Sequence, residues 1–208
     1  MLRILSLLTA VALQINAAPG QVALIPVEGE GAAYWPRWRG PSGQGHVAGA
    51  NYVDKWSNTQ NVRWKIQVPG RGHSSPIVWK DHLFITTARD GGAKVSMLAY
   101  RRSDGALLWE KEVPTSGVER AYRKNSHASA TPVTDGQRVY ASFGTHGLAA
   151  FDFKGALVWH RKLGDLRNYH GSAGSPVLYK DRRVVVTSCG PKAIPSERLS
   201  VERMLLSR

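Results

Sequence analysis

Short apolar segments separated by polar turns follow one another from residue 76 to residue 190. The segments are rich in Val, Leu, Tyr and Phe, which favours strands over helices. The turns between them carry pairs such as Asp135-Gly136 and Lys154-Gly155, and these residue types reverse the direction of the chain. The pattern predicts an all-β fold made of antiparallel strands.

One motif occurs three times, over residues 72–87, 129–142 and 174–187. Each copy begins with a small residue and a proline, continues with an apolar run and a polar turn, and ends with a second apolar run. Three tryptophans repeat at a similar period, at Trp64, Trp109 and Trp159. A period of this length is typical of repeat proteins.

Each complete unit is expected to contain four strands. The first unit predicts strands at residues 76–79, 83–87, 95–100 and 107–113. The second unit predicts them at residues 132–133, 138–143, 148–153 and 157–163. The third supplies only residues 176–179 and 183–188 before the pattern stops near Gly190.

A further strand is expected just before the first unit. Residues 62–68 alternate strictly, which places Val62, Trp64, Ile66 and Val68 on one face of an extended segment. The chain is thereby divided into a leader (1–18), an N-terminal arm (19–61), a repeat region (62–190, with units 64–109, 110–159 and a partial 160–190) and a tail (191–208).

The first residues have the features of a secretory signal peptide. Met1-Leu2-Arg3 supplies a positive charge, residues 4–13 are mostly apolar, and Ala17 and Ala18 supply a small-residue cleavage site. No later apolar run approaches the roughly 20 residues that span a bilayer, so no transmembrane segment is predicted. We expect an exported protein, periplasmic or secreted, and no lipid anchor, because no cysteine directly follows the apolar core of the leader.

The arm contains a cluster of aromatic and arginine residues, Tyr34-Trp35-Pro36-Arg37-Trp38-Arg39-Gly40-Pro41, with Trp56 beyond it. Such side chains stack on bases or sugars in some proteins. Packing of the arm against the repeats is the favoured interpretation, because tryptophan rings and arginine stems bury large apolar areas.

Charge and cysteine content exclude some classes of function. The formal net charge is +13, but the basic residues are dispersed over turns and strand ends, so nucleic acid is not expected as a partner. Cys189 is the single cysteine, which excludes an internal disulfide and a thiolate metal cluster.

The units end in a recognisable pattern of small residues and tryptophan. In the first unit the pattern is Ala99, Gly105 and Trp109, and in the second it is Ala150, Asp152, Gly155 and Trp159; Arg101 and Asp104 of the first unit depart from the family pattern described next, where they replace an Asp and a Thr. This pattern resembles the pyrroloquinoline-quinone-type (PQQ-like) β-propeller repeat of exported bacterial proteins. The resemblance implies antiparallel four-stranded propeller blades, about two and a half of them in this chain.

The resemblance implies a non-enzymatic binding or assembly scaffold, whose partner is a protein or a small ligand of unspecified kind. The alternative is a fragment of a PQQ-dependent dehydrogenase, which would hold PQQ and calcium. Such enzymes commonly carry adjacent cysteines, which this chain lacks, so no cofactor and no catalytic residue are expected.

Histidines and serines precede each repeated proline and form a candidate ligand site at the rim of a central channel. The residues are His73, Ser74, Ser75, His127, Ser129, His170 and Ser172. Three imidazoles that converge could bind a metal or an anion. Hydrogen bonding of loop backbone between blades is the favoured explanation, because the spacing from histidine to proline differs from copy to copy.

The repeat pattern predicts an incomplete propeller. Residues 191–208 leave the register of the repeats, so we expect a truncated member of the family, whose bare strand edges favour self-association.

Overall fold

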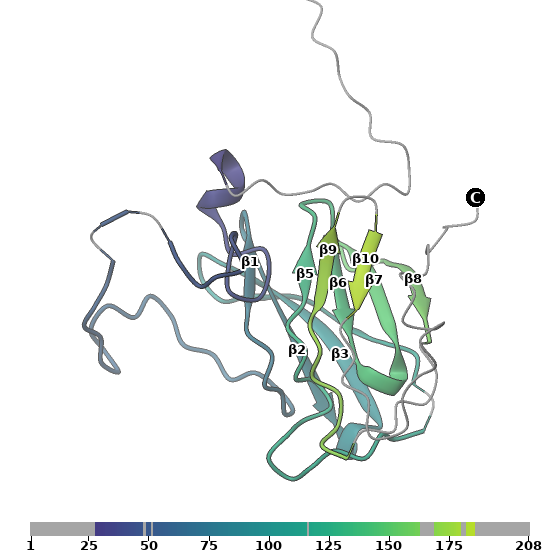
Figure 1. The fold of residues 1–208 in the computed structure, drawn as a ribbon. Helices are drawn as coiled ribbons and strands as arrows, with labels where there is room; N and C mark the ends of the chain where they lie inside the picture. Colours follow the sequence, from purple (N-terminus) through teal and green to yellow (C-terminus); the bar gives the residue numbers. More distant parts are fainter. Residues whose placement is uncertain are drawn as a thin grey trace, which may run out of the picture.

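The computed structural model describes residues 28–47, 49–50, 52–115, 117–162, 169–179 and 182–185. These residues form two four-stranded antiparallel sheets and a two-stranded hairpin, as shown in Figure 1. The leader at 1–18 and the tail at 191–208 lie outside the described residues. In the described part of the chain, no helix is long and apolar enough to cross a membrane.

The first sheet has the order β1-β2-β3-β4 and the second the order β5-β6-β7-β8. The strands of the first are β1 (Ile77–Trp79), β2 (His82–Arg89), β3 (Lys94–Arg101) and β4 (Leu107–Glu112). Those of the second are β5 (Val133–Thr134), β6 (Arg138–Ser142), β7 (Leu148–Asp152) and β8 (Leu157–Arg161). The hairpin pairs β9 (Pro176–Tyr179) with β10 (Arg182–Val185), and three short 3-10 turns, η1 (Gly29–Ala33), η2 (Asp90–Gly92) and η3 (Gly144–His146), complete the described elements.

The two sheets are copies of one unit. Both carry a register shift at the same place, between Ala99 and Tyr100 in β3 and between Ala150 and Phe151 in β7. The alanine before the shift faces the unit's tryptophan, Trp109 or Trp159, on the outer strand. The prediction of an all-β fold with four-stranded antiparallel blades is confirmed.

The predicted strand at residues 62–68 is wrong. None of these residues pairs as a strand with any described residue. Trp64 and Ile66 do share a face, and both side chains pack against Gly105. Alternation therefore identified Trp64 and Ile66 as half-buried, but Val62 and Val68 are exposed, and a strand also requires a hydrogen-bonded neighbour.

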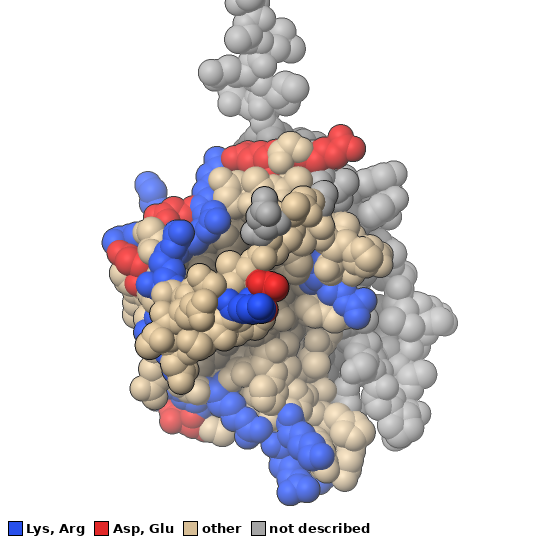
Figure 2. All heavy atoms as spheres, turned by 90° about the vertical axis from the view of Figure 1, so that its left-hand side faces the viewer, with Lys and Arg blue, Asp and Glu red and all other residues tan. Residues whose placement is uncertain are grey.

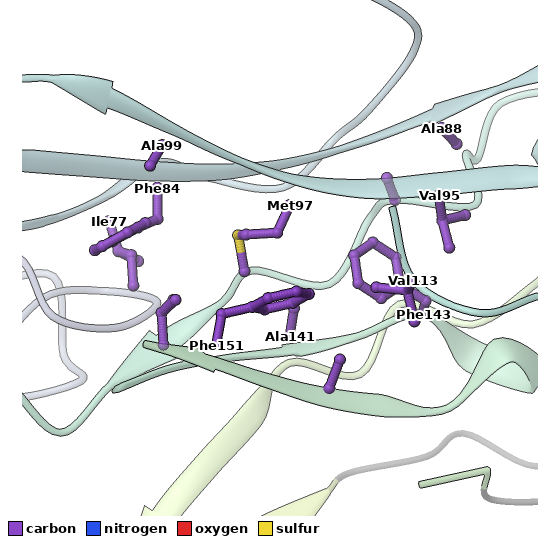
Figure 3. Packing of buried hydrophobic residues seen from close by; sticks show 13 residues of the cluster. Ile77, Phe84, Ala88, Val95, Met97, Ala99, Val113, Ala141, Phe143 and Phe151 are labelled. Carbon is purple, nitrogen blue, oxygen red and sulfur yellow. The ribbon is translucent and has the colours of Figure 1, made fainter. Parts of the chain in front are cut away.

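The main core lies between the two sheets. Figure 3 shows side chains of the first sheet, such as Phe84 and Met97, pointing toward Ala141 and Phe151 of the second. The full cluster is Ile77, Phe84, Ala88, Val95, Met97, Ala99, Val113, Ala128, Val139, Ala141, Phe143, Ala149 and Phe151. The second sheet is also covered on its other face, where Leu178 of β9 packs with Val133, Tyr140, Ala150 and Trp159. Successive units therefore stack face to face.

The arm is attached through its first aromatic residues. The backbone of Trp35 exchanges two hydrogen bonds with Val78 of β1 (3.0 and 2.8 Å), and the Pro36 carbonyl oxygen accepts a hydrogen bond from Thr134 of β5 (3.0 Å). The packing interpretation holds for Trp35. It fails for Trp38 and Trp56, which are 52% and 71% exposed.

Candidate functional site

The repeated prolines lie in three loops that lead into β1, β5 and β9, referred to below as the pre-strand loops (residues 70–76, 126–132 and 170–176). The residue before each proline is Ser75, Thr131 or Ser175. The Ser75 N–H donates to Thr131 Oγ1 (3.0 Å), and the Thr131 N–H donates to Ser175 Oγ (2.9 Å). A hydroxyl ladder thus joins the same position of three successive units.

Ser74 and His73 take part in the same junction. The backbone N–H groups of both residues donate to the Ala128 carbonyl oxygen (3.0 and 3.1 Å). Ser74 Oγ is buried and accepts a hydrogen bond from the Thr86 N–H of β2 (3.2 Å). Ser74 and Ser75 therefore hold the first pre-strand loop against the second unit and the first sheet.

The three candidate histidines lie in the pre-strand loops, but their side chains differ in environment. His73 and His170 are exposed. His127 is half-buried, its Nε2 donates to the Glu119 carbonyl oxygen (2.6 Å), and its ring packs against Gly92. In the described ranges, no group of three His, Cys, Asp or Glu side chains is arranged to hold a metal ion.

Ser129 closes its own loop. Its hydroxyl lies 2.9 Å from Ser126 Oγ and 2.5 Å from Asn125 Oδ1, while Asn125 Nδ2 donates to the His170 carbonyl oxygen (2.7 Å). The second and third pre-strand loops are joined in this way.

Ser172 binds a buried carboxylate that sequence reasoning missed. The Ser172 hydroxyl donates to Glu119 Oε1 (2.7 Å), and the Thr145 N–H donates to Oε2 (2.9 Å). Glu119 lies in the loop between the two sheets, Thr145 in η3, and Ser172 in the loop before β9. One side chain therefore connects three parts of the chain.

His146 is a second buried polar residue that the sequence pattern did not single out. Its Nε2 donates to the Gly92 carbonyl oxygen (2.9 Å) across the junction between the sheets. Burial lowers the pKa of His146 below its ordinary value of 6.5, and the hydrogen bond to Gly92 opposes this effect. The imidazole is therefore held in its neutral form as a structural donor.

A sequence signal for these residues did exist. The connection from β4 to β5 is much longer than the turns within the sheets, and long connections in a compact domain often carry function. Glu119 lies within it. His146, however, lies in a short turn, and its burial depends on the neighbouring sheet.

Trp64 and Trp109 each pack against a glycine in a turn between two strands. Trp64 packs against Gly105 and its Nε1 donates to the Arg102 carbonyl oxygen (2.9 Å). Trp109 packs against Gly155 in the same way, and its Nε1 donates to the Phe153 carbonyl oxygen (2.9 Å). The interpretation as a packing residue between blades is confirmed for Trp109, which joins β4 of the first sheet to the β7–β8 turn of the second. Trp64 packs within the first unit (64–109).

A pocket of about 610 Å³ opens beside these loops, between the β2–β3 turn of the first sheet and the connection from β4 to β5. It is lined by Gly70 and Arg71, by residues 88–92 at the β2–β3 turn, and by residues 121–123 and 125–127. This pocket was not expected from the sequence. Its lining includes His127, one of the candidate site residues.

The fold and these loops can be compared with known proteins. The sequence profile of the PQQ-like repeat family described as "Outer membrane protein assembly factor BamB" matches residues 32–195, most of the chain. The chain belongs to this family. Membership accounts for the four-stranded units and for the repeated glycine and tryptophan positions.

Solved structures of similar fold include members of two functional classes. BamB from Moraxella catarrhalis has a TM-score of 0.49 and 18% identity, over 62% of this chain and 38% of that one. A europium-containing methanol dehydrogenase has a TM-score of 0.42 and 18% identity, over 57% of this chain and 21% of that one. The chain thus spans less than half the length of either structure. Comparison with curated proteins found no match.

Proposed function

We propose that this chain is a non-enzymatic, exported β-propeller repeat protein that acts as a binding or assembly scaffold. The family description, an assembly factor of the outer membrane, supports a scaffold role. The signal-peptide pattern at residues 1–18 supports export to the periplasm or beyond it.

The observation that carries the proposal is the use made of the candidate site residues. Ser74, Ser129 and Ser172 each form hydrogen bonds within or between the pre-strand loops. In this chain, these serine hydroxyls form the hydrogen bonds that fix the pre-strand loops.

The surface charge also favours a protein or small-ligand partner over nucleic acid. Figure 2 shows the Lys and Arg side chains of one face in separate groups, with Asp and Glu among them. Nucleic-acid binding generally needs a continuous basic patch along the path of the phosphates.

The residues present do not fit the calcium-bound quinone of a PQQ-dependent dehydrogenase. Glu119 is a buried carboxylate in the region of the pre-strand loops, and both of its oxygens accept hydrogen bonds from Ser172 and Thr145. Calcium takes about six to eight oxygen ligands, and within the described residues Glu119 belongs to no group of three His, Cys, Asp or Glu side chains that could hold a metal ion. We therefore expect no cofactor in this chain.

Addition of PQQ and calcium to the purified chain tests the proposal against its alternative. A scaffold leaves the quinone absorbance unchanged and reduces no dye when alcohol is supplied. A PQQ-dependent dehydrogenase assayed in parallel provides the positive control. Alcohol-dependent dye reduction by the chain would overturn the scaffold proposal in favour of the dehydrogenase fragment.

A further inference from the structure

We propose that the pocket between the β2–β3 turn and the β4–β5 connection binds a small anionic organic molecule through Arg71 and Arg123. This inference concerns a site that the scaffold proposal does not use. It rests on the charge, the shape and the rigidity of the pocket.

The charge of the pocket is unbalanced. Two of its ionic side chains are neutralised: Arg89 forms a two-pronged hydrogen-bonded ion pair with Glu110, and Asp90 lies 3.0 Å from Lys94 Nζ. Within the described residues, neither Arg71 nor Arg123 has a carboxylate partner. Two uncompensated guanidinium groups therefore line one concavity.

The Arg71 side chain is fixed to the segment that carries Arg123. Arg71 Nη2 donates to the Arg123 carbonyl oxygen (2.7 Å), so the loop before β1 and the loop before β5 are tied together at the pocket. The remaining N–H groups of Arg71 and the guanidinium of Arg123 are left for a ligand. Guanidinium groups bind carboxylate and phosphate oxygens with short, charge-assisted hydrogen bonds.

The rest of the lining suits a carbon skeleton. Ala88, Ala121 and the half-exposed ring of Tyr122 contribute apolar walls. A pocket of about 610 Å³ is of the size that holds small organic molecules, and is much larger than a single inorganic ion requires. The ligand class is therefore an organic carboxylate or an organic phosphate.

One wall of the pocket is held firmly. The His127 ring packs so closely on Gly92 that any side chain at position 92 would overlap it, and Nε2 of the same ring is bonded to the Glu119 carbonyl oxygen. A binding surface fixed in advance loses less entropy when a ligand binds. Ligand binding here would link the first and second units.

Calorimetric titration of the full chain with matched aromatic probes tests the inference. Phthalate provides the carboxylate, phenyl phosphate provides the phosphate ester, and benzyl alcohol is the neutral control. We expect saturable binding of at least one anion, weakened by added salt, and none of the alcohol. The probe that binds more tightly shows whether the pocket prefers a carboxylate or a phosphate.

Two variants locate the binding. R71Q and R123Q are each expected to raise the dissociation constant of the bound anion by tenfold or more. The control R102Q, which removes an exposed arginine from the β3–β4 turn, should leave this constant unchanged. The Arg123 side chain forms no hydrogen bond with a described residue, so R123Q should melt at the wild-type temperature and separate binding from folding.

Two results would overturn the inference: no binding of either aromatic anion, whether or not a hexaglutamate peptide binds, or wild-type affinity in both R71Q and R123Q. None of these results changes the outcome expected of the dye-reduction assay. The anion-binding proposal and the scaffold proposal can therefore be rejected separately.

Discussion

At the scale of single residues, the junctions between units depend on positions that admit no larger side chain. Gly155 has a φ of +89°, and a Cβ there would lie 2.9 Å from Trp109 Cδ2. Gly105 has a φ of +75° and would place a Cβ 2.7 Å from Trp64 Cε3. Both the backbone conformation and the space require glycine.

Substitution of Gly155 tests this requirement. G155A is expected to lower the free energy of unfolding by about 2 kcal/mol or more, because strain at positive φ adds to overlap with Trp109. Urea denaturation measures the change. The matched control is G91A, since Gly91 also has a positive φ (+65°) but no atom near its added Cβ. Equal losses in both variants would show that the tryptophan contact is unimportant.

His146 makes a prediction about pH. Its pKa is lowered by burial, so the unfolded chain binds a proton more readily than the folded one, and stability is lost as the pH falls below about 6.5. Denaturation at pH 7 and pH 5 should show a smaller loss for H146Q than for the wild type. Some loss remains, since burial also lowers the pKa of His82. Parallel losses in H146Q and wild type would contradict the assignment.

At the scale of elements, the hydroxyl ladder joins the strands that follow the prolines. Thr131 is its central member, because it accepts from Ser75 and donates its N–H to Ser175. A buried N–H that loses its acceptor costs about 1–3 kcal/mol. The ladder therefore contributes to the stacking of the units as well as to the loops themselves.

The variant T131V removes the acceptor with little change in shape. We expect a loss of about 1–3 kcal/mol in the free energy of unfolding, with faster amide exchange at Ser75. The control is T115V, because the Thr115 hydroxyl forms no hydrogen bond with a described residue. Unchanged exchange at Ser75 would show that the ladder bond is not formed in solution.

The strands within each unit could be predicted from sequence, because hydrophobic runs and turn residues are local signals. The β3 and β7 strands, for example, lie within one or two residues of their predicted bounds. The segment at residues 62–68 was predicted wrongly because strand pairing depends on a distant neighbour. For the same reason Glu119 and His146 were missed: their partners, Ser172 and Gly92, are far away in sequence.

At the scale of the whole molecule, the described sheets are not closed into a ring. In the part of the chain that the structure describes, β4 and β8 each have one hydrogen-bonded neighbour. Unpaired strand edges favour association with other chains. The unpaired edges of β4 and β8 could therefore pair with a second copy of the chain or with a strand of a partner protein.

Self-association is the expected consequence. Size-exclusion chromatography with light scattering should show dimers or larger species of the full chain, with an average mass that rises with protein concentration. A monomer at every concentration tested would contradict this expectation. The substitution V158K places a charge at an apolar position of the outer strand β8 and should reduce the association. The comparison variant is K111E on β4, which replaces one charged side chain by another.

The serine side chains of the pre-strand loops and their hydrogen-bond partners are proposed to hold the units together. Glu119 and Ser172 test it most directly, because they come from different units and their oxygens lie 2.7 Å apart. A double-mutant cycle with E119A, S172A and the double variant, followed by urea denaturation, measures their coupling. We predict a coupling free energy between the two side chains of about 1 kcal/mol or more. Additive effects, with unaltered stability in S172A, would contradict it.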